Sequence, residues 1–359
     1  MSLILLNPGP VTLSERVRTA MLRPDLCHRE VEFAELQGGL RSKLLGIYDL
    51  PAAAWAAVLL TGSGTAAVEA MLTSCVPDDG SLLVVENGVY GERMSRIAEA
   101  HGIAFKRIAS AWDEPMDLAA IENALSIGTA ITHIAAVHHE TTTGRLNDLA
   151  TLGKICQAAG VRLLLDGVSS FGAETLEFDD WQLDACAATA NKCLHGVPGT
   201  AFVIVRRAAL GEHNAARRSV YLDLREYLTR QDQNGTPFTQ SIQTFYALDE
   251  ALDEFIEAGG WQARRRLFVA RLAAIRDRLV KLDVTPLLDA GDCSCVLHAF
   301  ELPPGKTYDE LHRILKARGF IIYAGQGALS DRVFRISAMG EISSTDLERL
   351  FDAFDAALK

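Results

Sequence analysis

The chain has 359 residues and an ordinary globular composition, with 49% hydrophobic and 23% charged residues. That length is enough for one large domain with its own core and a smaller second domain. The formal net charge of -11 argues against a surface that binds nucleic acid or an anionic membrane, so any anion-binding site has to be local.

The first ten residues are expected to form neither a signal peptide nor a membrane span, because their apolar run stops at Asn7 and no basic region precedes it. No other stretch reaches membrane-spanning length. The seven cysteines are an odd number, and Cys75, Cys156 and Cys186 lie within apolar segments. We therefore expect buried thiols in a reducing compartment and predict a cytoplasmic protein.

The first two thirds of the chain alternate short apolar segments with helical patterns. Strands are predicted at 57–60, 82–86, 131–137, 162–165, 185–189 and 201–205, and helices at 15–21, 30–45, 65–76, 92–101, 117–125 and 149–159. Ser14 and Asp148 are plausible N-caps for the first and the last of these helices. Such an alternation predicts an α/β fold, with a mostly parallel sheet covered on both faces.

The pattern changes after Arg207. A polar stretch spans 223–239, with an evident loop at 231–235, and a long helical region spans 242–282 with a break at 257–260. A solvated face is the expected role of the arginines in its second half, which are Arg264, Arg265, Arg266, Arg271, Arg276 and Arg278. Strands at 295–300, 320–323 and 333–336 and helices at 308–317 and 345–358 then predict a small α+β domain. We expect a large domain over 1–245, which includes the N-terminal segment, and a small domain over 246–359.

A phosphate-binding turn is predicted at Gly62-Ser63-Gly64-Thr65, which follows a strand and opens a helix. Backbone N–H groups and the helix dipole make such a turn an anion site. The same letters match the dinucleotide fingerprint G-x-G-x-x-A, and Glu86 ends the next strand where a ribose-binding acid is expected. An NAD-dependent oxidoreductase using Gly62 to Glu86 is therefore the main alternative from another class.

Asp166 and Lys192 distinguish the two hypotheses, because a dinucleotide site leaves both without a role. Asp166 closes the apolar run 163–165, and Lys192 stands on a turn of small residues before the apolar run 201–205. Pyridoxal phosphate needs a lysine amine to bind its aldehyde and a buried carboxylate to keep its ring nitrogen protonated. In α/β sheets such residues meet beyond the carboxyl ends of the strands. The sequence therefore favours a pyridoxal-phosphate enzyme.

Longer stretches resemble the class V aminotransferases of the fold-type-I pyridoxal-phosphate superfamily, and especially the 2-aminoethylphosphonate:pyruvate transaminases. The matching stretches are 6–10, 62–64, 67–70, 87–93, 138–144, 166–172, 190–193, 196–199, 222–224 and 334–336. The resemblance implies a homodimeric transaminase that moves the amino group of 2-aminoethylphosphonate to pyruvate, giving phosphonoacetaldehyde and alanine. An alanine or serine transaminase acting with glyoxylate or pyruvate stays open, as does a non-catalytic relative that keeps the fold for binding.

The resemblance also implies roles for individual residues. Lys192 would bind the aldehyde of the cofactor and then carry the proton, while Asp166 would pair with the ring nitrogen. Arg335 would bind the anionic end of the substrate, a task that suits a guanidinium. The other implied residues are Ser63, Gly64 and Thr65 for the phosphate, Tyr90 stacked on the ring, Thr141 near the ring hydroxyl, Val168 and Thr239 for the cofactor, and Gly9 and Arg29 for the substrate.

Three segments depart from the family pattern. Leu26-Cys27-His28-Arg29-Glu30 stands where a tryptophan- and aspartate-rich stretch is common, and 238–242 lacks the expected Ser-Pro-Thr-His. Ala324-Gly325-Gln326 replaces Pro-Gly-Lys and so removes a positive charge ahead of Arg335. The change at 238–242 bears on the contact that the resemblance implies between this loop and the cofactor phosphate of the neighbouring subunit. Together the changes bear on 2-aminoethylphosphonate as the amino donor rather than on transaminase chemistry. No metal site is predicted, and His138 and His139 are expected to be satisfied core histidines or to support the site from behind.

Overall fold

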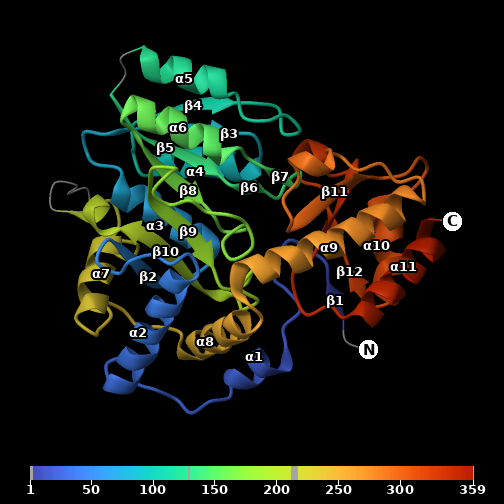
Figure 1. The fold of residues 1–359 in the computed structure, drawn as a ribbon, viewed down its shortest axis with the longest axis horizontal. Coiled ribbons are helices and arrows are strands. Elements are labelled where there is room, and N and C mark those ends of the chain that lie inside the picture. Colours follow the sequence, from blue (N-terminus) through green and yellow to red (C-terminus); the bar gives the residue numbers. More distant parts are fainter. Residues whose placement is uncertain (1–2, 128–129, 212–216, 359) are drawn as a thin grey trace.

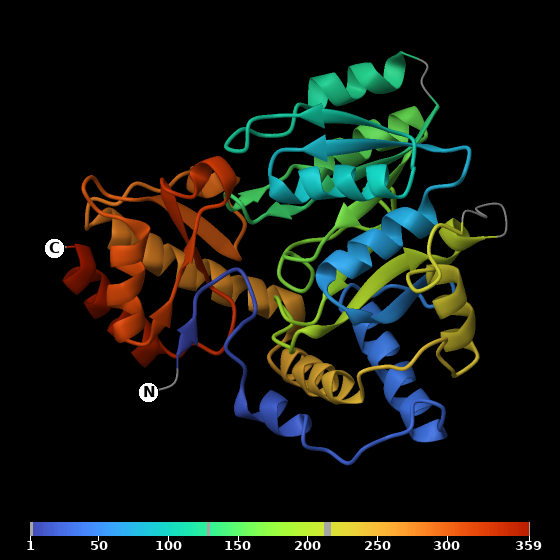
Figure 2. The same ribbon diagram turned by 180° about the vertical axis from the view of Figure 1, so that it is seen from behind.

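The computed structural model describes residues 3–127, 130–211 and 217–358. Figure 1 shows a large layered body, formed by the blue to yellow part of the chain, beside a smaller body formed by the orange to red part. Helix α9 (Gly260–Val280) runs between the two bodies, and both ends of the chain lie at the smaller one. The view from behind in Figure 2 shows the same division.

The large body is built on a seven-stranded sheet with the strand order β2-β10-β9-β8-β5-β3-β4. Its strands are β2 (Trp55–Gly62), β3 (Ser81–Glu86), β4 (Phe105–Ala109), β5 (Ile131–Val137), β8 (Arg162–Asp166), β9 (Leu183–Thr189) and β10 (Gly199–Arg206). Strand β10 runs antiparallel to both of its neighbours, and the other pairs of this sheet are parallel. The predicted α/β fold with a mostly parallel sheet is confirmed.

Helices cover both faces of this sheet, as the alternation predicted. One face carries α2 (Val31–Gly46), α5 (Leu118–Ser126), α6 (Leu149–Ala159) and α8 (Ile242–Glu257), and the other carries α3 (Gly64–Cys75), α4 (Val89–Ala100) and α7 (Leu224–Asp232). Side chains of each strand alternate between the two cores: Leu59 of β2 packs in the first, whereas Val58 and Leu60 pack in the second. Burial on both faces explains why these strands are near-continuous apolar runs in the sequence.

The small body has a core of its own. An antiparallel sheet of order β11-β14-β13 consists of β11 (Leu297–Glu301), β14 (Val333–Ser337) and β13 (Tyr323–Ala324), while β1 (Ile4–Leu5) pairs in parallel with β12 (Phe320–Ile321). Helices α9, α10 (Tyr308–Ala317) and α11 (Ser344–Leu358) pack against these strands. Because β1 belongs to this core and α8 to the large one, we propose a domain boundary between α8 and α9, in place of the expected division at 245.

Short elements complete the fold. They are α1 (Glu15–Ala20), the antiparallel pair β6 (His139–Glu140) and β7 (Arg145–Leu146), and 3₁₀ turns at Arg207–Leu210, Ala290–Asp292 and Gly327–Leu329. Ser14 and Asp148 cap α1 and α6 as expected, because their side chains accept N–H groups of the first turns. Within the described ranges, no helix combines the length and the apolar character needed to cross a membrane.

Among the strands and α-helices of five or more residues, two were not predicted from the sequence. Strand β4 lies at the edge of the sheet with Lys106 and Arg107 exposed, so it lacks the apolar run that marks the central strands. Helix α7 lies within the polar stretch 223–239. It buries only a narrow stripe that includes Leu224 and Tyr227, and the Asp223 side chain caps it.

The expectation of a solvated arginine face on α9 is wrong for two residues. Arg264 and Arg271 are each only 8% exposed. Arg271 donates hydrogen bonds to the carbonyl oxygens of Ala338, Gly340 and Ile342, at 2.6 to 3.0 Å. This arginine therefore binds α9 to the segment that follows β14.

Candidate active site

The turn between β2 and α3 forms one wall of the candidate site. Ser63 is the N-cap of α3 in an extended conformation, and its side chain makes no capping hydrogen bond. The first N–H groups of a helix have no partner within the helix, and the helix dipole favours an anion there. A Cβ on Gly64 would lie 2.8 Å from Val168 Cγ1, so this close packing requires glycine. The predicted turn has the geometry of a phosphate site.

Lys192 lies on the turn that follows β9. Its Nζ donates a hydrogen bond to the carbonyl oxygen of Pro8, from the N-terminal segment. Surrounding protein penalises the charged ammonium and lowers the pKa of Lys192 to about 8. The turn itself is fixed by two backbone hydrogen bonds, from His195 N–H to the Lys192 carbonyl at 3.0 Å and from Gly196 N–H to the Ala190 carbonyl at 2.8 Å. An amine with this lowered pKa is suited to attack an aldehyde.

The N-terminal segment lies against Lys192. Gly9 has a φ of 115°, a backbone conformation that favours glycine. A Cβ on Gly9 would lie 2.7 Å from Lys192 Cδ, so a side chain at this position would displace the lysine. The structure therefore gives Gly9 a packing role beside Lys192, and its contact with substrate stays a prediction.

Asp166 ends β8, the neighbour of β9 in the sheet. It is 6% exposed, and its Oδ1 accepts the N–H of Val168 at 3.0 Å. Burial raises the pKa of Asp166 to about 6, while that hydrogen bond and the charges of Arg93 and Lys192 oppose the rise. The carboxylate is therefore ionised at neutral pH, as pairing with a protonated ring nitrogen requires.

A cavity of about 460 Å³ lies between the phosphate-binding turn and Lys192. Its lining includes the turn Ser63–Thr65, Tyr90, Val168, Lys192 and Arg93. The volume lies within the range of roughly 300–1,000 Å³ that is usual for small-molecule sites. Residues that are far apart in the sequence thus meet beyond the carboxyl ends of β2, β8 and β9, where α/β sheets place their ligands.

Arg335, on β14, is an almost fully buried cation with 1% exposure. Its Nε donates to the Ala324 carbonyl at 2.8 Å, and its Nη1 donates to the Thr141 carbonyl at 2.8 Å and to Gln326 Oε1 at 3.3 Å. Neither its Nη2 nor the Thr141 hydroxyl has a hydrogen-bond partner among the described residues. Because none of these partners carries a negative charge, the arrangement favours an anionic ligand.

Six of the predicted residues are not among those that line this cavity: Gly9, Arg29, Thr141, Asp166, Thr239 and Arg335. Gly9 packs against Lys192, and Asp166 accepts the N–H of Val168, so both adjoin its lining. Arg29 lines a separate cavity of about 350 Å³ together with Arg230 and residues of 233–237. Thr239 is exposed in the segment that leads into α8. The structure thus places Arg29 beside the segment that carries Thr239, and the roles of Arg29 for the substrate and of Thr239 for the cofactor stay predictions.

Arg93 and Glu140 are polar residues near the site to which the sequence assigned no role. Arg93 lines the cavity. Glu140 is fully buried and accepts hydrogen bonds from the Thr142 hydroxyl at 2.6 Å and from the Tyr90 N–H at 3.2 Å. Burial raises the pKa of Glu140 to about 7. Both residues stand in stretches that carried the family resemblance, which was the only signal that pointed to them.

His138 and His139 are buried, and burial lowers the pKa of each to about 4. His139 Nδ1 lies 3.1 Å from the Ser169 carbonyl oxygen. Nδ1 of His138 and Nε2 of His139, however, have no hydrogen-bond partner in the described part of the chain. Of the two roles expected for these histidines, the satisfied core histidine does not describe these two atoms, and the role of supporting the site from behind stays a prediction. Their neutral rings suit that role rather than that of a base.

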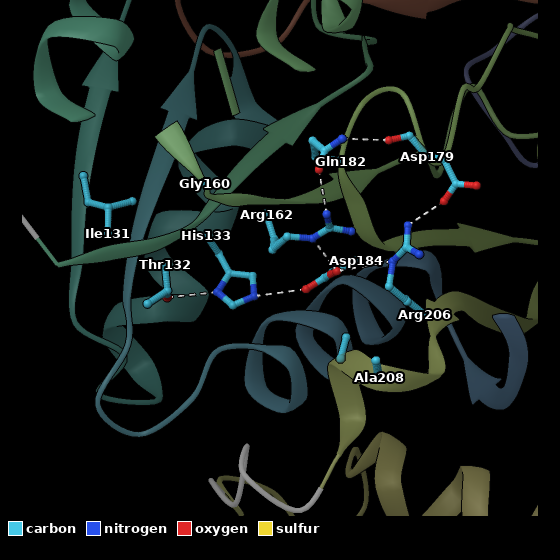
Figure 3. Close-up of a pocket in the computed structure, with 11 residues that line it drawn as sticks. Ile131, Thr132, His133, Gly160, Arg162, Asp179, Gln182, Asp184, Arg206 and Ala208 are labelled. Atoms are coloured by element: carbon cyan, nitrogen blue, oxygen red, sulfur yellow. Dashed lines mark hydrogen bonds and ion pairs between the residues drawn. The ribbon is translucent and has the colours of Figure 1, made fainter. Parts of the chain in front are cut away.

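A larger cavity, of about 740 Å³, lies at the opposite ends of the strands (Figure 3). Its charged side chains pair with one another: Asp184 lies 2.7 Å from Arg162 Nε and 3.5 Å from His133 Nε2, and Asp179 lies 2.6 Å from Arg206 Nη2. These contacts tie together the amino ends of β5, β8 and β9. We assign the network a stabilising role, because its charges already satisfy one another.

The dinucleotide alternative gains no support from the geometry. Glu86, its candidate ribose ligand, is 6% exposed and accepts a hydrogen bond from the Ser95 hydroxyl on α4. The cavity beside the glycine-rich turn contains Lys192 instead, which a nicotinamide site does not need.

Comparisons with known proteins agree with this geometry. The sequence profile of the family described as Aminotransferase class-V matches residues 27–350. The chain is 37% identical over 360 residues to the 2-aminoethylphosphonate–pyruvate transaminase of Klebsiella pneumoniae subsp. pneumoniae, covering 99% of this chain and 97% of that protein. It is 36% identical over 353 residues to the protein of the same name from Bacillus cytotoxicus, covering 97% and 96% of the two chains.

Solved structures with the same fold include two aminotransferases. The alanine–glyoxylate aminotransferase of Nostoc sp. superimposes with a TM-score of 0.91 at 25% identity, covering 100% of this chain and 96% of that one. The subgroup IV aspartate aminotransferase of Thermus thermophilus superimposes with a TM-score of 0.89 at 27% identity, covering 99% of both chains. Both alignments include the large and the small body.

Proposed function

Because the chain belongs to the class V aminotransferases, which are pyridoxal-phosphate enzymes of fold type I, we propose that it moves the amino group of 2-aminoethylphosphonate to pyruvate. The products are phosphonoacetaldehyde and alanine. The names of the curated relatives supply this pair of substrates. The structural observation that carries the proposal is Arg335, a buried guanidinium whose hydrogen-bond partners leave its charge uncompensated.

The residues present fit pyridoxal phosphate. We assign the phosphate to the Ser63–Thr65 turn, whose N-cap hydroxyl makes no capping bond, and the aldehyde to Lys192. The ring nitrogen is assigned to Asp166. Tyr90 and Val168 would pack against the ring, and the Thr141 hydroxyl, which has no partner among the described residues, would be available to the ring hydroxyl. When bound, the cofactor supplies an electron sink for the negative charge that develops on the reacting carbon of the substrate.

Lys192 is the proton carrier in this proposal. Its Nζ would hold the aldehyde of the cofactor at rest and would be free to carry a proton once the substrate is bound. An amine whose pKa lies near 8 both accepts and returns a proton close to neutral pH, so Lys192 Nζ would accept the proton that leaves the substrate carbon and give it up again. Reaction with pyruvate reverses these steps, and ping-pong kinetics are expected.

Asp166 and Arg335 act by charge rather than by proton transfer. Asp166 stays ionised above its pKa of about 6 and keeps the ring nitrogen protonated. Arg335 binds the anionic group, first of the amino donor and then of pyruvate, through the Nη2 that has no partner in the described chain. Binding an anion there also compensates the buried charge, which favours the occupied state.

We further propose a cytoplasmic homodimer. Thr239 is exposed and Arg29 lies beside its segment, so both belong to one surface that a second copy of the chain can cover. In that dimer the segment carrying Thr239 would reach the phosphate turn of the partner subunit. All seven cysteines are free thiols, which fits a reducing compartment.

An alanine or serine transaminase is the second candidate. Gln326 contacts Arg335, at the position where the family resemblance led us to expect a lysine. A neutral amide there leaves a single positive charge beside the anionic end of the substrate. That balance suits a carboxylate as well as it suits a dianionic phosphonate.

A visible absorption spectrum, followed by titration with 2-aminoethylphosphonate and separately with L-alanine, tests the proposal. We expect an absorption band from the lysine-bound cofactor and its loss on addition of the phosphonate. A band that responds only to alanine or serine would keep the transaminase and discard the phosphonate. A protein that shows no band even after pyridoxal phosphate is added would contradict the roles of Lys192 and Asp166.

A further inference from the structure

Arg93 is a cation in the cavity to which no role has been given. It lies on α4, one turn after Tyr90. Its Nη1 donates a hydrogen bond to Thr65 Oγ1 at 3.1 Å, and its guanidinium carbon lies 4.7 Å from the centre of the Tyr90 ring. In the described part of the chain it forms no ion pair with a carboxylate. Two predicted cofactor contacts, Thr65 and Tyr90, therefore hold a positive charge that has no carboxylate within ion-pair distance among the described residues.

The charge balance of the phosphate turn explains why such a cation matters. A phosphate ester carries about -1.5 to -2 charges at neutral pH, and the Ser63–Thr65 turn offers only hydroxyl and N–H groups. Lys192 is committed to the aldehyde. Arg335 is held by backbone groups of the small domain and of Thr141. Among the described residues that line the cavity, Arg93 is the cation that remains for the phosphate.

The charge of Arg93 also acts on Asp166 and Lys192. It contributes to lowering the pKa of Asp166 and that of Lys192. Arg93 therefore faces the interior of the site rather than solvent beyond α4. By contrast Arg96, three residues later on the same helix, is exposed and does not line the cavity.

We propose that Arg93 binds the phosphate of the cofactor. This inference rests on the proposed function, and it adds a cationic ligand to the Ser63–Thr65 turn. Thr65 Oγ1 accepts from Arg93 and can donate its own hydrogen to the phosphate, so that the two side chains act as a pair. Stacking on the Tyr90 ring keeps the guanidinium in place before the cofactor arrives.

Binding of two probes to the apo-protein tests the inference. Pyridoxal phosphate and pyridoxal share the ring and the aldehyde, and only the first has the phosphate. We expect Arg93→Met to weaken binding of pyridoxal phosphate by roughly 10- to 100-fold, the range for a hydrogen-bonded charge pair. Binding of pyridoxal should not change, Arg93→Lys should be intermediate, and Arg96→Met should match the unaltered protein for both probes.

Each other outcome overturns the inference. An equal loss for both probes would show that Arg93 acts by holding the Tyr90 ring. If binding of both probes is unchanged, Arg93 does not bind the phosphate, whether or not the KM for the amino donor rises. If Arg93→Met does not fold, as judged by thermal melting, the ratio of the two affinities in Arg93→Lys decides. The unaltered protein tests the proposed function separately, through its absorption band and its reaction with 2-aminoethylphosphonate.

Discussion

Arg335 Nη1 donates a hydrogen bond of 2.8 Å to the carbonyl oxygen of Thr141, and this contact joins the small domain to the large one at the edge of the site. Thr141 lies in the turn between β6 and β7, just after β5, whereas Arg335 lies in the middle strand of the small sheet. Backbone oxygens thus orient the guanidinium without neutralising it. A cation that is oriented before the substrate arrives binds an anion with little further ordering.

Replacement of Arg335 by lysine tests this role. Arg335→Lys keeps the charge, but a lysine ammonium cannot bind the Ala324 and Thr141 carbonyls and an anion in one plane. We expect the KM for 2-aminoethylphosphonate to rise by roughly 10- to 100-fold while the cofactor absorption band stays unchanged. Arg332→Lys, at an exposed position three residues earlier, is the matched control. An unaltered dependence on the amino donor would refute the anion-binding role.

The Asp166→Asn variant tests the pairing with the ring nitrogen. An asparagine of the same shape cannot hold that nitrogen in its protonated form, so the variant should bind the cofactor but lose the electron sink. We expect the rate of the half-reaction with the amino donor to fall by at least about 100-fold, the effect of breaking a buried charge pair. Single-turnover absorbance measurements follow this rate directly. Asp180→Asn, on the surface, should leave the rate unchanged.

Features that follow apolar runs could be predicted from the sequence. Asp166 ends a buried strand and Lys192 follows one, and parallel strands bring their carboxyl ends to one edge of a sheet. The local signals of α6 were equally clear: Asp148 caps its first turn, and Gly160 ends it in a left-handed conformation.

Long-range contacts account for what the sequence did not reveal. The pairing of β1 with β12 joins segments that are more than three hundred residues apart, and a two-residue strand has no pattern of its own. The burial of Arg271 depends on carbonyls of the segment after β14. The role of Arg93 likewise depends on its contacts with Thr65, at the start of α3, and with Tyr90, one turn earlier on α4.

The pKa of Lys192 predicts how cofactor uptake depends on pH. The neutral amine attacks the aldehyde, and burial lowers the pKa of Lys192 from its ordinary value of 10.5 to about 8. The rate of pyridoxal phosphate incorporation into the apo-protein should therefore rise with pH below about 8 and level off above it. Stopped-flow absorbance from about pH 6 to about pH 10 covers both ionisation states. A rate that keeps rising to the upper limit would show a lysine with an ordinary pKa, and Lys192→Arg should abolish incorporation.

The contacts of Arg271 indicate that this residue holds the segment after β14 against the Lys192 turn. Its guanidinium satisfies the carbonyls of Ala338, Gly340 and Ile342, and the N–H of that same Gly340 donates to His195 Nε2 at 2.8 Å. Loss of the guanidinium leaves several buried carbonyls without a donor, each at a cost of about 1–3 kcal/mol. We therefore expect Arg271→Met to lower the free energy of unfolding by roughly 3–5 kcal/mol.

Urea unfolding of the apo-protein measures this loss, with Arg266→Met as the control. Arg266 is exposed on the same helix, and its replacement should change the free energy of unfolding by less than about 0.5 kcal/mol. Because the Gly340 segment also contacts the Lys192 turn through His195, Arg271→Met should additionally slow cofactor incorporation, whereas the control should not. A loss of stability below about 1 kcal/mol would mean that water replaces the guanidinium at these carbonyls, and that α9 does not fix the segment.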